Sequence, residues 1–385
     1  MSWDTCKFSS LYAIPSRNGL SIPSTKHGRG NKMINMGELF AYGRIPDVPM
    51  ELVELSDSMK ANYNVEKDDL LFARRSLVLE GAGKCSWVKE VSDITTFESS
   101  IIRVRLDKER AVPLFYYYYF KSPQSPIKTI VQQCAQSGIR ASDLADLSVH
   151  SPPLSTQRRI ADILSAYDDL IENNLRQIKL LEEAAMRLYR EWFVFMRFPG
   201  HESVRIEDGV PEGWEKIRTS SVMKFNYGKG LLEANRSGDG YPVFGSSGIV
   251  GYHDAPLVNE NCVIVGRKGN VGSVYMSLMP SYPIDTVFYI IPEIDIYYCY
   301  FELKSRTFVN NDSAVPGLNR EIAEDMPMLL PSDKILEEFH NLIDSYIQRI
   351  SYLEQQNVLL QKARDALLPR LMNGGVGLKL EEEAV

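Results

Sequence analysis

Cysteine and histidine are scarce in this sequence, and their spacing argues against a metal site. The five cysteines lie at positions 6, 85, 134, 262 and 299, without a Cys-x-x-Cys pair or a Cys/His spacing that suits zinc. The five histidines, at positions 27, 150, 201, 253 and 340, form no pair at metal-ligand spacing. We therefore expect reduced thiols that pack in cores or lie at surfaces.

Long hydrophobic runs are also missing. No stretch approaches 18 consecutive apolar residues, and the run Phe115–Phe120 is too short and too rich in tyrosine to cross a bilayer. The first residues lack the basic-then-apolar pattern of a secretion signal. With 385 residues, of which 44% are hydrophobic and 24% charged, the chain is expected to form two or three globular domains in the cytoplasm.

Motifs for common enzymatic chemistry are incomplete. Gly81–Ser86 resembles the end of a phosphate loop, but Val78 replaces the required glycine and Cys85 the required Ser or Thr. Ser151–Leu154 resembles the Pro-Pro loop of amino-methyltransferases, but it lacks the polar and aromatic residues that hold a flipped base. A proline pair that ends a domain is the favoured interpretation. No glycine-rich turn for S-adenosylmethionine, nuclease acid-x-Lys pair or Gly-x-Ser-x-Gly elbow is present, so we expect no catalytic site.

Negative charge dominates, but unevenly. The net charge is −7, which by itself argues against a nucleic-acid-binding protein. Residues 1–150 nevertheless hold 19 Lys and Arg against 17 Asp and Glu, whereas residues 201–330 hold 11 against 17. Because local potential governs the encounter with a charged partner, basic clusters within an acidic total still count.

The stretch from Ser155 to Phe195 contains neither Gly nor Pro and carries a heptad pattern. Ile, Leu, Tyr, Ile, Asn, Ile, Leu, Ala, Leu and Trp occupy positions 160, 164, 167, 171, 174, 178, 181, 185, 188 and 192. The pattern predicts a helix of about 40 residues and roughly 60 Å. A single apolar stripe needs a partner helix.

A second heptad pattern supplies that partner. Positions 336, 339, 343, 346, 350, 353, 357, 360, 367 and 371 hold Leu, Phe, Ile, Tyr, Ile, Leu, Asn, Leu, Leu and Leu, and Arg364 fills the remaining slot. The order is globular unit, helix, globular unit, helix, which predicts two antiparallel helices and an approximate two-fold axis. The predicted class is α+β, with two mixed α/β domains separated by a long two-helix coiled coil. The predicted limits are 1–152 and 199–330 for the two domains, 153–198 and 331–374 for the helices, and 375–385 for an acidic tail.

Within the globular domains, short apolar runs predict strands at Leu70–Phe72, Ser86–Val88 and Ile101–Leu106. Val112–Phe120 fits either a helix or a strand. The segment Arg17–Lys32 reads as a basic loop rich in Gly, Ser and Asn. Asn261–Gly266 is predicted to be a buried strand that leads into a basic turn, and Asp295–Phe308 a helix.

Basic and polar turns in both domains suit the reading of a duplex at two places, since Arg, Lys, Asn and Ser contact bases and phosphates. The candidates are Arg17, Asn18, Lys26, Arg29, Lys32, Arg74, Arg75, Lys84 and Arg140 in the first domain, and Lys224, Lys229, Ser246, Ser247, His253, Arg267, Lys268, Asn270 and Arg320 in the second. For each one, a solvated surface charge is the competing interpretation. Arg267 and Lys268 stand out, because the flanking Gly266 and Gly269 let the backbone approach a partner closely. Asn174 and Asn357 are either chance interruptions or residues that set the register of the helix pair.

Several segments together resemble one known family. They are Gln157–Leu164, Ile178–Ala185, Leu188–Phe193, Arg197–Glu202, Val210–Trp214, Pro242–Gly251, Val265–Gly272 and Gln361–Gly374, with Asp69–Arg74 and Ser137–Ile139 less distinctive. The chain resembles the DNA-specificity subunit of type I restriction–modification systems over nearly its whole length.

The resemblance implies a non-catalytic subunit whose two recognition domains each read one half of a split, asymmetric DNA site. It implies helices that fix the spacing and bind two methyltransferase subunits carrying S-adenosylmethionine. Restriction subunits would add translocation and cleavage with ATP and Mg²⁺, and no cofactor is expected on this chain. Two alternatives stay open: a DNA-modifying enzyme in its own right, and a protein–protein scaffold that never touches DNA.

Overall fold

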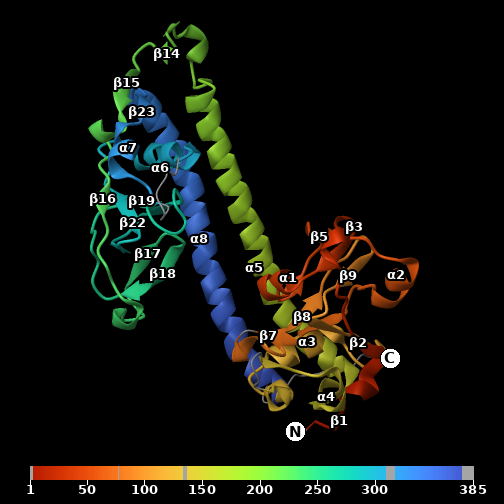
Figure 1. Ribbon diagram of the computed structural model, residues 1–385. Helices are drawn as coiled ribbons and strands as arrows, with labels where there is room; N and C mark the ends of the chain where they lie inside the picture. Colours follow the sequence, from red (N-terminus) through yellow and green to blue (C-terminus); the bar gives the residue numbers. More distant parts are fainter. Residues whose placement is uncertain (1–2, 77, 133–136, 309–316, 375–385) are drawn as a thin grey trace, which may run out of the picture. The chain divides into compact units, whose positions relative to one another are not determined.

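The computed structural model describes residues 3–76, 78–132, 137–308 and 317–374. The chain forms two compact units: unit 1 is Met1–Asn173 with Gln356–Val385, and unit 2 is Asn174–Gln355. Two long helices, α5 (Leu154–Tyr189) and α8 (Asp333–Met372), each contribute a segment to both units (Figure 1). The predicted domain limits stay a prediction. None of the described helices combines the length and the apolar content that a membrane-spanning segment needs.

Unit 1 is built on a five-stranded sheet in the order β2-β10-β6-β8-β4. Its central strand β6 is a short apolar run buried on both faces, and the neighbouring β10 is also largely buried although it contains Arg103 and Arg105. The strands are β2 (Tyr12–Asn18), β10 (Ile101–Leu106), β6 (Leu70–Ala73), β8 (Cys85–Val88) and β4 (Arg44–Ile45).

Smaller elements complete unit 1. The second sheet is β5 (Glu51–Val53), β3 (His27–Ile34) and β9 (Thr95–Phe97), and the strand pairs are β1 (Thr5–Lys7) with β12 (Ser148–His150), and β7 (Arg75–Ser76) with β11 (Ser137–Gly138). The helices are α1 (Met36–Ala41), α2 (Asp57–Tyr63), α3 (Pro113–Lys121) and α4 (Ala141–Asp146), with short turns η1 (Phe8–Leu11), η2 (Ser24–Lys26), η3 (Leu79–Gly81) and η4 (Pro126–Ile130).

The segment that fitted either a helix or a strand is α3. Pro113 stands at the start of the helix, where its missing N–H costs nothing. The six aromatic residues Phe115–Phe120 are all buried in the core of unit 1. A helix that is apolar on every side shows no clear periodicity, which explains why the pattern was ambiguous.

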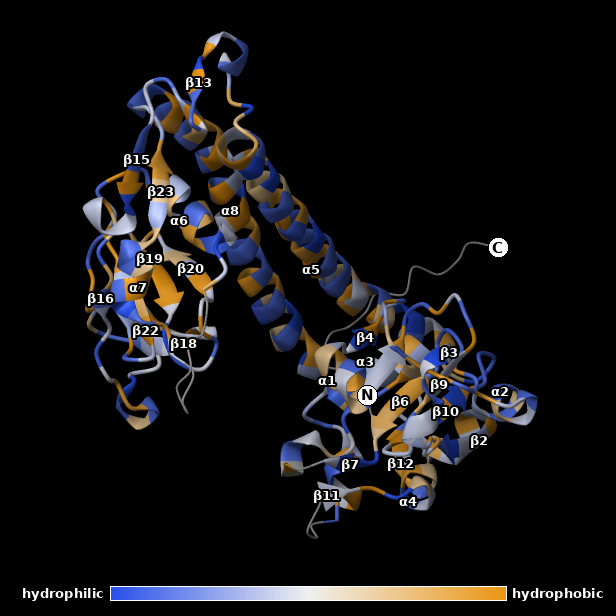
Figure 2. Ribbon diagram, turned by 45° about the horizontal axis from the view of Figure 1, so that its top comes forward, coloured by the Kyte–Doolittle hydropathy of each residue, from blue (hydrophilic) through white to orange (hydrophobic). Residues whose placement is uncertain are grey.

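Unit 2 contains a four-stranded sheet in the order β16-β22-β19-β20, and Figure 2 shows the apolar residues of β19 and β20 in orange. Its strands are β16 (Asn226–Tyr227), β22 (Val287–Ile290), β19 (Cys262–Gly266) and β20 (Val274–Ser277). The second sheet is β18 (Gly248–His253), β17 (Tyr241–Gly245) and β21 (Tyr282–Pro283), and the pairs are β15 (Glu215–Arg218) with β23 (Pro327–Leu330), and β13 (Ile206–Glu207) with β14 (Val210–Pro211). The helices are α6 (Ile296–Ser305), α7 (Arg320–Asp325) and the π-helical η5 (Arg190–Val194), with turns η6 (His201–Ser203), η7 (Thr219–Ser221) and η8 (Glu233–Asn235).

The globular parts of the two units repeat one another element by element. The antiparallel strands β2-β10-β6-β8 of unit 1 match β16-β22-β19-β20 of unit 2 in order and in direction. In both units a buried helix follows, and later a six-residue helix. The strand after it pairs with the strand that precedes β2 or β16, so β12 pairs with β1 and β23 pairs with β15. A long helix comes next each time. The predicted internal repeat is therefore present in the order of elements.

Both heptad patterns form buried stripes, and Figure 2 shows mixed apolar and polar residues along α5 and α8. In unit 1, Ile160 and Leu164 of α5 share a core with Leu368 and Leu371 of α8. In unit 2, Figure 1 shows α8 passing beside α6. There Tyr189 of α5 lies against Phe339 of α8, with ring centroids 6.4 Å apart. Burial, and then the nearby charge of Glu182 on α5, raise the pKa of Glu354 on α8. Residue numbers rise along one helix as they fall along the other, so the helices of unit 2 are antiparallel.

Polar contacts attach the sheet of unit 1 to α5. Arg44, a buried residue of β4, places Nη2 2.5 Å from Asp169 and Nε 3.3 Å from Glu172. Lys89, just after β8, places Nζ 2.5 Å from Glu172. These ion pairs fix the orientation of the sheet against the helix, since buried charges require partners.

Candidate nucleic-acid interface

In unit 2 the candidate Arg267 follows β19 directly. Its backbone N–H donates to the carbonyl of Thr286 (2.9 Å), and its own carbonyl accepts from Leu318 (2.9 Å). The side chain donates from Nη1 to the carbonyl of Asp285 at 3.2 Å. The guanidinium lies 4.9 Å from the ring centroid of Tyr227. Backbone and side chain are thus both held in place.

Tyr227 connects Arg267 with a second arginine. The Arg320 guanidinium lies 5.9 Å from the same ring, while its Nε donates to Glu324 at 3.1 Å. The tyrosine itself is 52% exposed. Two guanidinium groups against an exposed aromatic ring form a surface that can stack with a base and donate hydrogen bonds. We did not predict Tyr227 from the sequence, although its turn, Tyr227–Gly230, is visible there.

Two loops of unit 2 meet beside this cluster. The backbone N–H of Asn270 donates to Ser246 Oγ at 3.4 Å, and Ser273 donates its hydroxyl to the Ser246 carbonyl at 2.6 Å. Gly266 makes the sharp return possible, because a Cβ there would overlap the Asn270 carbonyl oxygen. The candidates Lys229, Ser247, Lys268 and Asn270 are exposed on these turns.

The other two candidates of unit 2 have contacts elsewhere. Lys224 forms a 3.2 Å ion pair with Glu293. His253, on β18, lies 3.3 Å from Asp254 and edge-on to the ring of Tyr282. No described contact joins either residue to the Arg267 cluster.

In unit 1, several candidates lie at one end of the five-stranded sheet. The register pairs Asn18 with Ile102, Ala73 with Ile101 and Phe72 with Cys85. This brings the ends of β2 and β6 and the start of β8 to one edge, with Asn18, Arg74, Arg75 and Lys84. Arg140, which is exposed, follows β11, the partner strand of β7.

The basic stretch Arg17–Lys32 is not a loop throughout, and that prediction was wrong. Arg17 and Asn18 end β2, with the Arg17 guanidinium 4.9 Å from the Tyr63 ring centroid, and β3 begins at His27. Arg29 and Lys32 lie on β3, which belongs to the other sheet of unit 1. The sheet pairing was not visible from composition alone.

Acidic neighbours compensate the charges of β3. Arg29 Nε lies 2.6 Å from Glu54, and Lys32 Nζ lies 2.6 Å from Asp47 and 3.3 Å from Asp93. The hydrogen bond to Asp47 raises the pKa of Lys32. Lys26, in η2 before β3, is exposed. Arg29 and Lys32 are therefore less suited than Arg74 to bind a polyanion.

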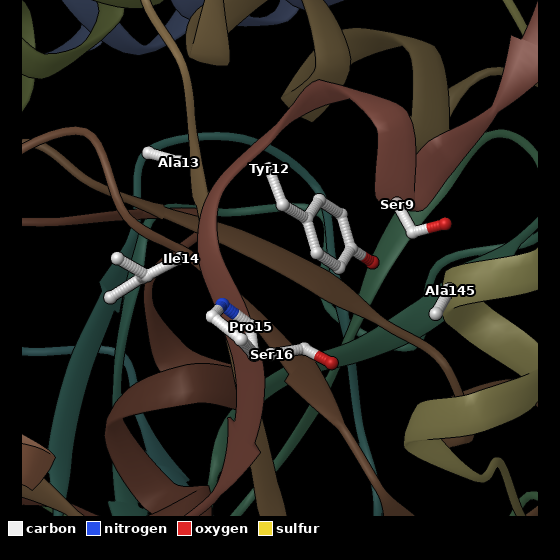
Figure 3. A pocket seen from close by; sticks show the side chains of 7 residues that line it. All are labelled: Ser9, Tyr12, Ala13, Ile14, Pro15, Ser16 and Ala145. Atoms are coloured by element: carbon white, nitrogen blue, oxygen red, sulfur yellow. The ribbon is translucent and has the colours of Figure 1, made fainter.

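Two hollows lie near these residues in unit 1. One, of about 710 Å³, is lined by apolar side chains with Lys84, Lys121 and Lys128, and the Lys84 ammonium donates to the Phe40 carbonyl at 2.8 Å. The other, of about 340 Å³, is shown in Figure 3, where the Tyr12 ring and the hydroxyl of Ser9 border it. Burial raises the pKa of the Tyr12 phenol, which therefore stays neutral. Glu80 and Cys85 also line the larger hollow.

The buried thiols are poorly suited to nucleophilic chemistry. Burial raises the pKa of Cys262 to about 11 and that of Cys85 well above its ordinary value. Cys134 lies outside the described residues. Within the described ranges, no three His, Cys, Asp or Glu side chains converge as metal ligands would. The two motif-like segments have structural roles. In Gly81–Ser86, Lys84 precedes the strand β8 instead of a helix. In Ser151–Leu154, the Pro152 carbonyl accepts a hydrogen bond from the side chain of Gln157 at the start of α5.

Asn174 and Asn357 are both buried, 4% and 6% exposed. Their role in setting the register stays a prediction. The arginine at heptad position 364 is explained by a buried partner on α5. The Arg364 guanidinium donates to Asp168, and Asp168 also accepts a 2.6 Å hydrogen bond from Tyr118.

Comparison with known proteins agrees with this architecture. The sequence profile of the type I restriction modification DNA specificity domain matches residues 3–183 and again residues 211–361. The type I restriction enzyme MjaIX specificity subunit of Methanocaldococcus jannaschii is 24% identical over 81% of this chain and 79% of that protein. The HindI specificity subunit of Haemophilus influenzae is 22% identical over 82% and 88%. The solved S subunit of a type I restriction–modification system from M. genitalium has a TM-score of 0.59 and 17% identity, covering 96% of each chain. The two profile matches coincide with the two structural repeats.

Proposed function

Because the chain belongs to the family of type I restriction–modification DNA-specificity proteins, we propose that it reads a bipartite, asymmetric DNA site, one half with each globular module. Family membership makes it a non-catalytic specificity subunit. Its general role is DNA sequence recognition within a restriction–modification complex. The finer assignments concern which surfaces read DNA and how the complex is built.

The observation that carries the proposal is the cluster of Arg267, Arg320 and Tyr227. The Arg267 guanidinium, which has five N–H donors, donates one hydrogen bond to the Asp285 carbonyl. The guanidinium lies against the Tyr227 ring, and no carboxylate among the described residues forms an ion pair with it. A guanidinium held in this way can donate two bonds to O6 and N7 of a guanine. Lys229, Lys268 and Ser247 on the adjacent turns would contact phosphates.

The two half-sites should differ because the residues at matching positions differ. β2 of unit 1 ends in Asn18, whereas β16 of unit 2 ends in Tyr227. An amide pairs with adenine, and a tyrosine ring offers a stacking face. The same strand order thus carries an amide in unit 1 and an aromatic ring in unit 2, which favours two different half-sites.

We assign the helix pair two roles. It sets the spacer between the half-sites, with Asn174 and Asn357 fixing its register. Its exposed faces, which include Leu175, Leu180 and Leu342, serve as docking surfaces for two methyltransferase subunits. Those subunits would carry S-adenosylmethionine, and restriction subunits would bring ATP and Mg²⁺. The complex would act in the cytoplasm, where the chromosome is accessible.

The decisive experiment measures binding of a bipartite duplex by the full chain assembled with its methyltransferase subunits. Arg267→Ala should weaken recognition of one half-site by about 1–3 kcal/mol while assembly is unchanged. Lys224→Ala is the matched control, because it removes one positive charge from the same unit at a residue paired with Glu293. A steep salt dependence is expected for the intact complex. Intact assembly without sequence-selective DNA binding would instead favour the scaffold alternative.

A further inference from the structure

Arg74 of unit 1 occupies the same structural position as Arg267 of unit 2. Each residue directly follows the third strand of its sheet, β6 or β19. The Arg74 N–H donates to the Ser100 carbonyl at 2.7 Å, and the Arg74 carbonyl accepts from Ile139 at 3.0 Å. The corresponding Arg267 bonds, to Thr286 and from Leu318, are both 2.9 Å.

The side chains repeat the match. Arg74 Nη1 donates to the Ser99 carbonyl at 3.2 Å, and Arg267 Nη1 donates to the Asp285 carbonyl at 3.2 Å. Ser99 and Asp285 each lie two residues before the neighbouring strand, β10 or β22. The two guanidinium groups are therefore anchored through the same atom to equivalent carbonyl groups.

Glycines maintain the same surroundings in both units. The residue after each arginine, Arg75 or Lys268, pairs with a glycine, Gly138 or Gly317. At the end of the outer strand, a Cβ on Gly19 or on Gly228 would overlap a backbone carbonyl oxygen, of Glu98 or of Ile284. The backbone around Arg74 and the backbone around Arg267 therefore have the same arrangement, which we call the cradle, although the surrounding sequences differ.

We propose that Arg74 is the guanine-reading residue of the first module, equivalent to Arg267 in the second, so that each half-site contains one guanine read by this cradle. The inference rests on the proposed function and extends it to a specificity-determining residue of the first module. It also distinguishes Arg74 from its neighbours: Arg17 lies within β2, the outer strand, and Arg29 pairs with Glu54. Arg75, on the exposed β7, is left as a phosphate contact.

The test compares Arg74→Lys, Arg267→Lys and the unchanged chain, each assembled with methyltransferase subunits. Each complex selects from duplexes randomised in both half-sites. Lysine keeps the positive charge but lacks the rigid planar fork that aligns two parallel donors with O6 and N7. Arg74→Lys should lower discrimination at a single guanine of one half-site about 5- to 150-fold, and Arg267→Lys should do so in the other half-site.

Arg29→Ala is the matched control in unit 1, because it removes a charge that is 74% exposed and paired with Glu54. It should leave every position of the selected site unchanged. The inference is overturned if Arg74→Lys changes no position, changes the same half-site as Arg267→Lys, or weakens all sequences equally. Failure of the unchanged complex to select any bipartite site would overturn the proposed function itself, and the inference with it.

Discussion

The buried ion pair between Asp168 of α5 and Arg364 of α8 should be the most sensitive point of unit 1. The Asp168 side chain is 9% exposed and that of Arg364 13% exposed. Asp168 also accepts a hydrogen bond from Tyr118 at 2.6 Å. Arg364→Ala would leave a carboxylate with a single neutral donor in the interior. Breaking a buried pair in this way costs about 3–5 kcal/mol, a large part of the 5–15 kcal/mol typical of a whole domain.

Native-state hydrogen exchange is the appropriate assay, because a chain with two units need not unfold in one step. Amides of α3 and of residues 154–173 should lose about 3–5 kcal/mol of opening free energy in Arg364→Ala. Amides of unit 2, for example in β19 and β22, serve as the internal reference and should be unchanged.

A triple variant isolates the cause. Tyr118→Phe, Asp168→Leu and Arg364→Leu together remove all three polar groups and place leucine at the heptad position. Such replacements are neutral or stabilising by about 1–4 kcal/mol. If Arg364→Ala costs less than about 1 kcal/mol, the pair behaves like a screened surface pair and our reasoning is wrong.

Two further predictions concern the cradle and the helix pair. Gly228→Ala should displace the end of β16, because the new Cβ would overlap the Ile284 carbonyl oxygen. It should weaken binding to one half-site about tenfold or more in duplex-binding assays. Gly230→Ala is the control and should have no effect, because the nearest atom to a Cβ there is 3.9 Å away. Insertion of one heptad into both α5 and α8 should lengthen the selected spacer by about 10 Å, roughly three base pairs, without changing the half-sites; an unchanged spacer in the selected duplexes would contradict the spacer role.

The long helices were predictable because a heptad pattern depends only on local spacing. The predicted stripe positions, from Ile160 to Trp192 and from Leu336 to Leu371, are buried or partly buried in the structure. The predicted α+β class, with two mixed modules and paired long helices, is confirmed by the fold and by its structural relatives. The partner of Arg364 was not predictable, because Asp168 lies 196 positions away and no local pattern joins them.

The candidate interface was only partly predictable for the same reason. Glycines beside Arg267 pointed to the turn on which it lies, since they reflect a local backbone requirement. Tyr227 was missed because it meets Arg267 only through the pairing of β16 with β22 and of β22 with β19. Arg29 and Lys32 looked like equally good candidates, since their acidic partners Glu54 and Asp47 come from segments distant in sequence.

The division of each long helix between the two units has a consequence for synthesis on the ribosome. Unit 2 is one continuous segment, Asn174–Gln355, and all its residues are available before the last turns of α8 are made. Unit 1 needs Leu368 and Leu371 to complete its core and Arg364 to neutralise Asp168. The module translated first should therefore finish folding last. Until α8 is complete, Asp168 lacks its partner Arg364, and the apolar stripe of α5 in unit 1 lacks Leu368 and Leu371.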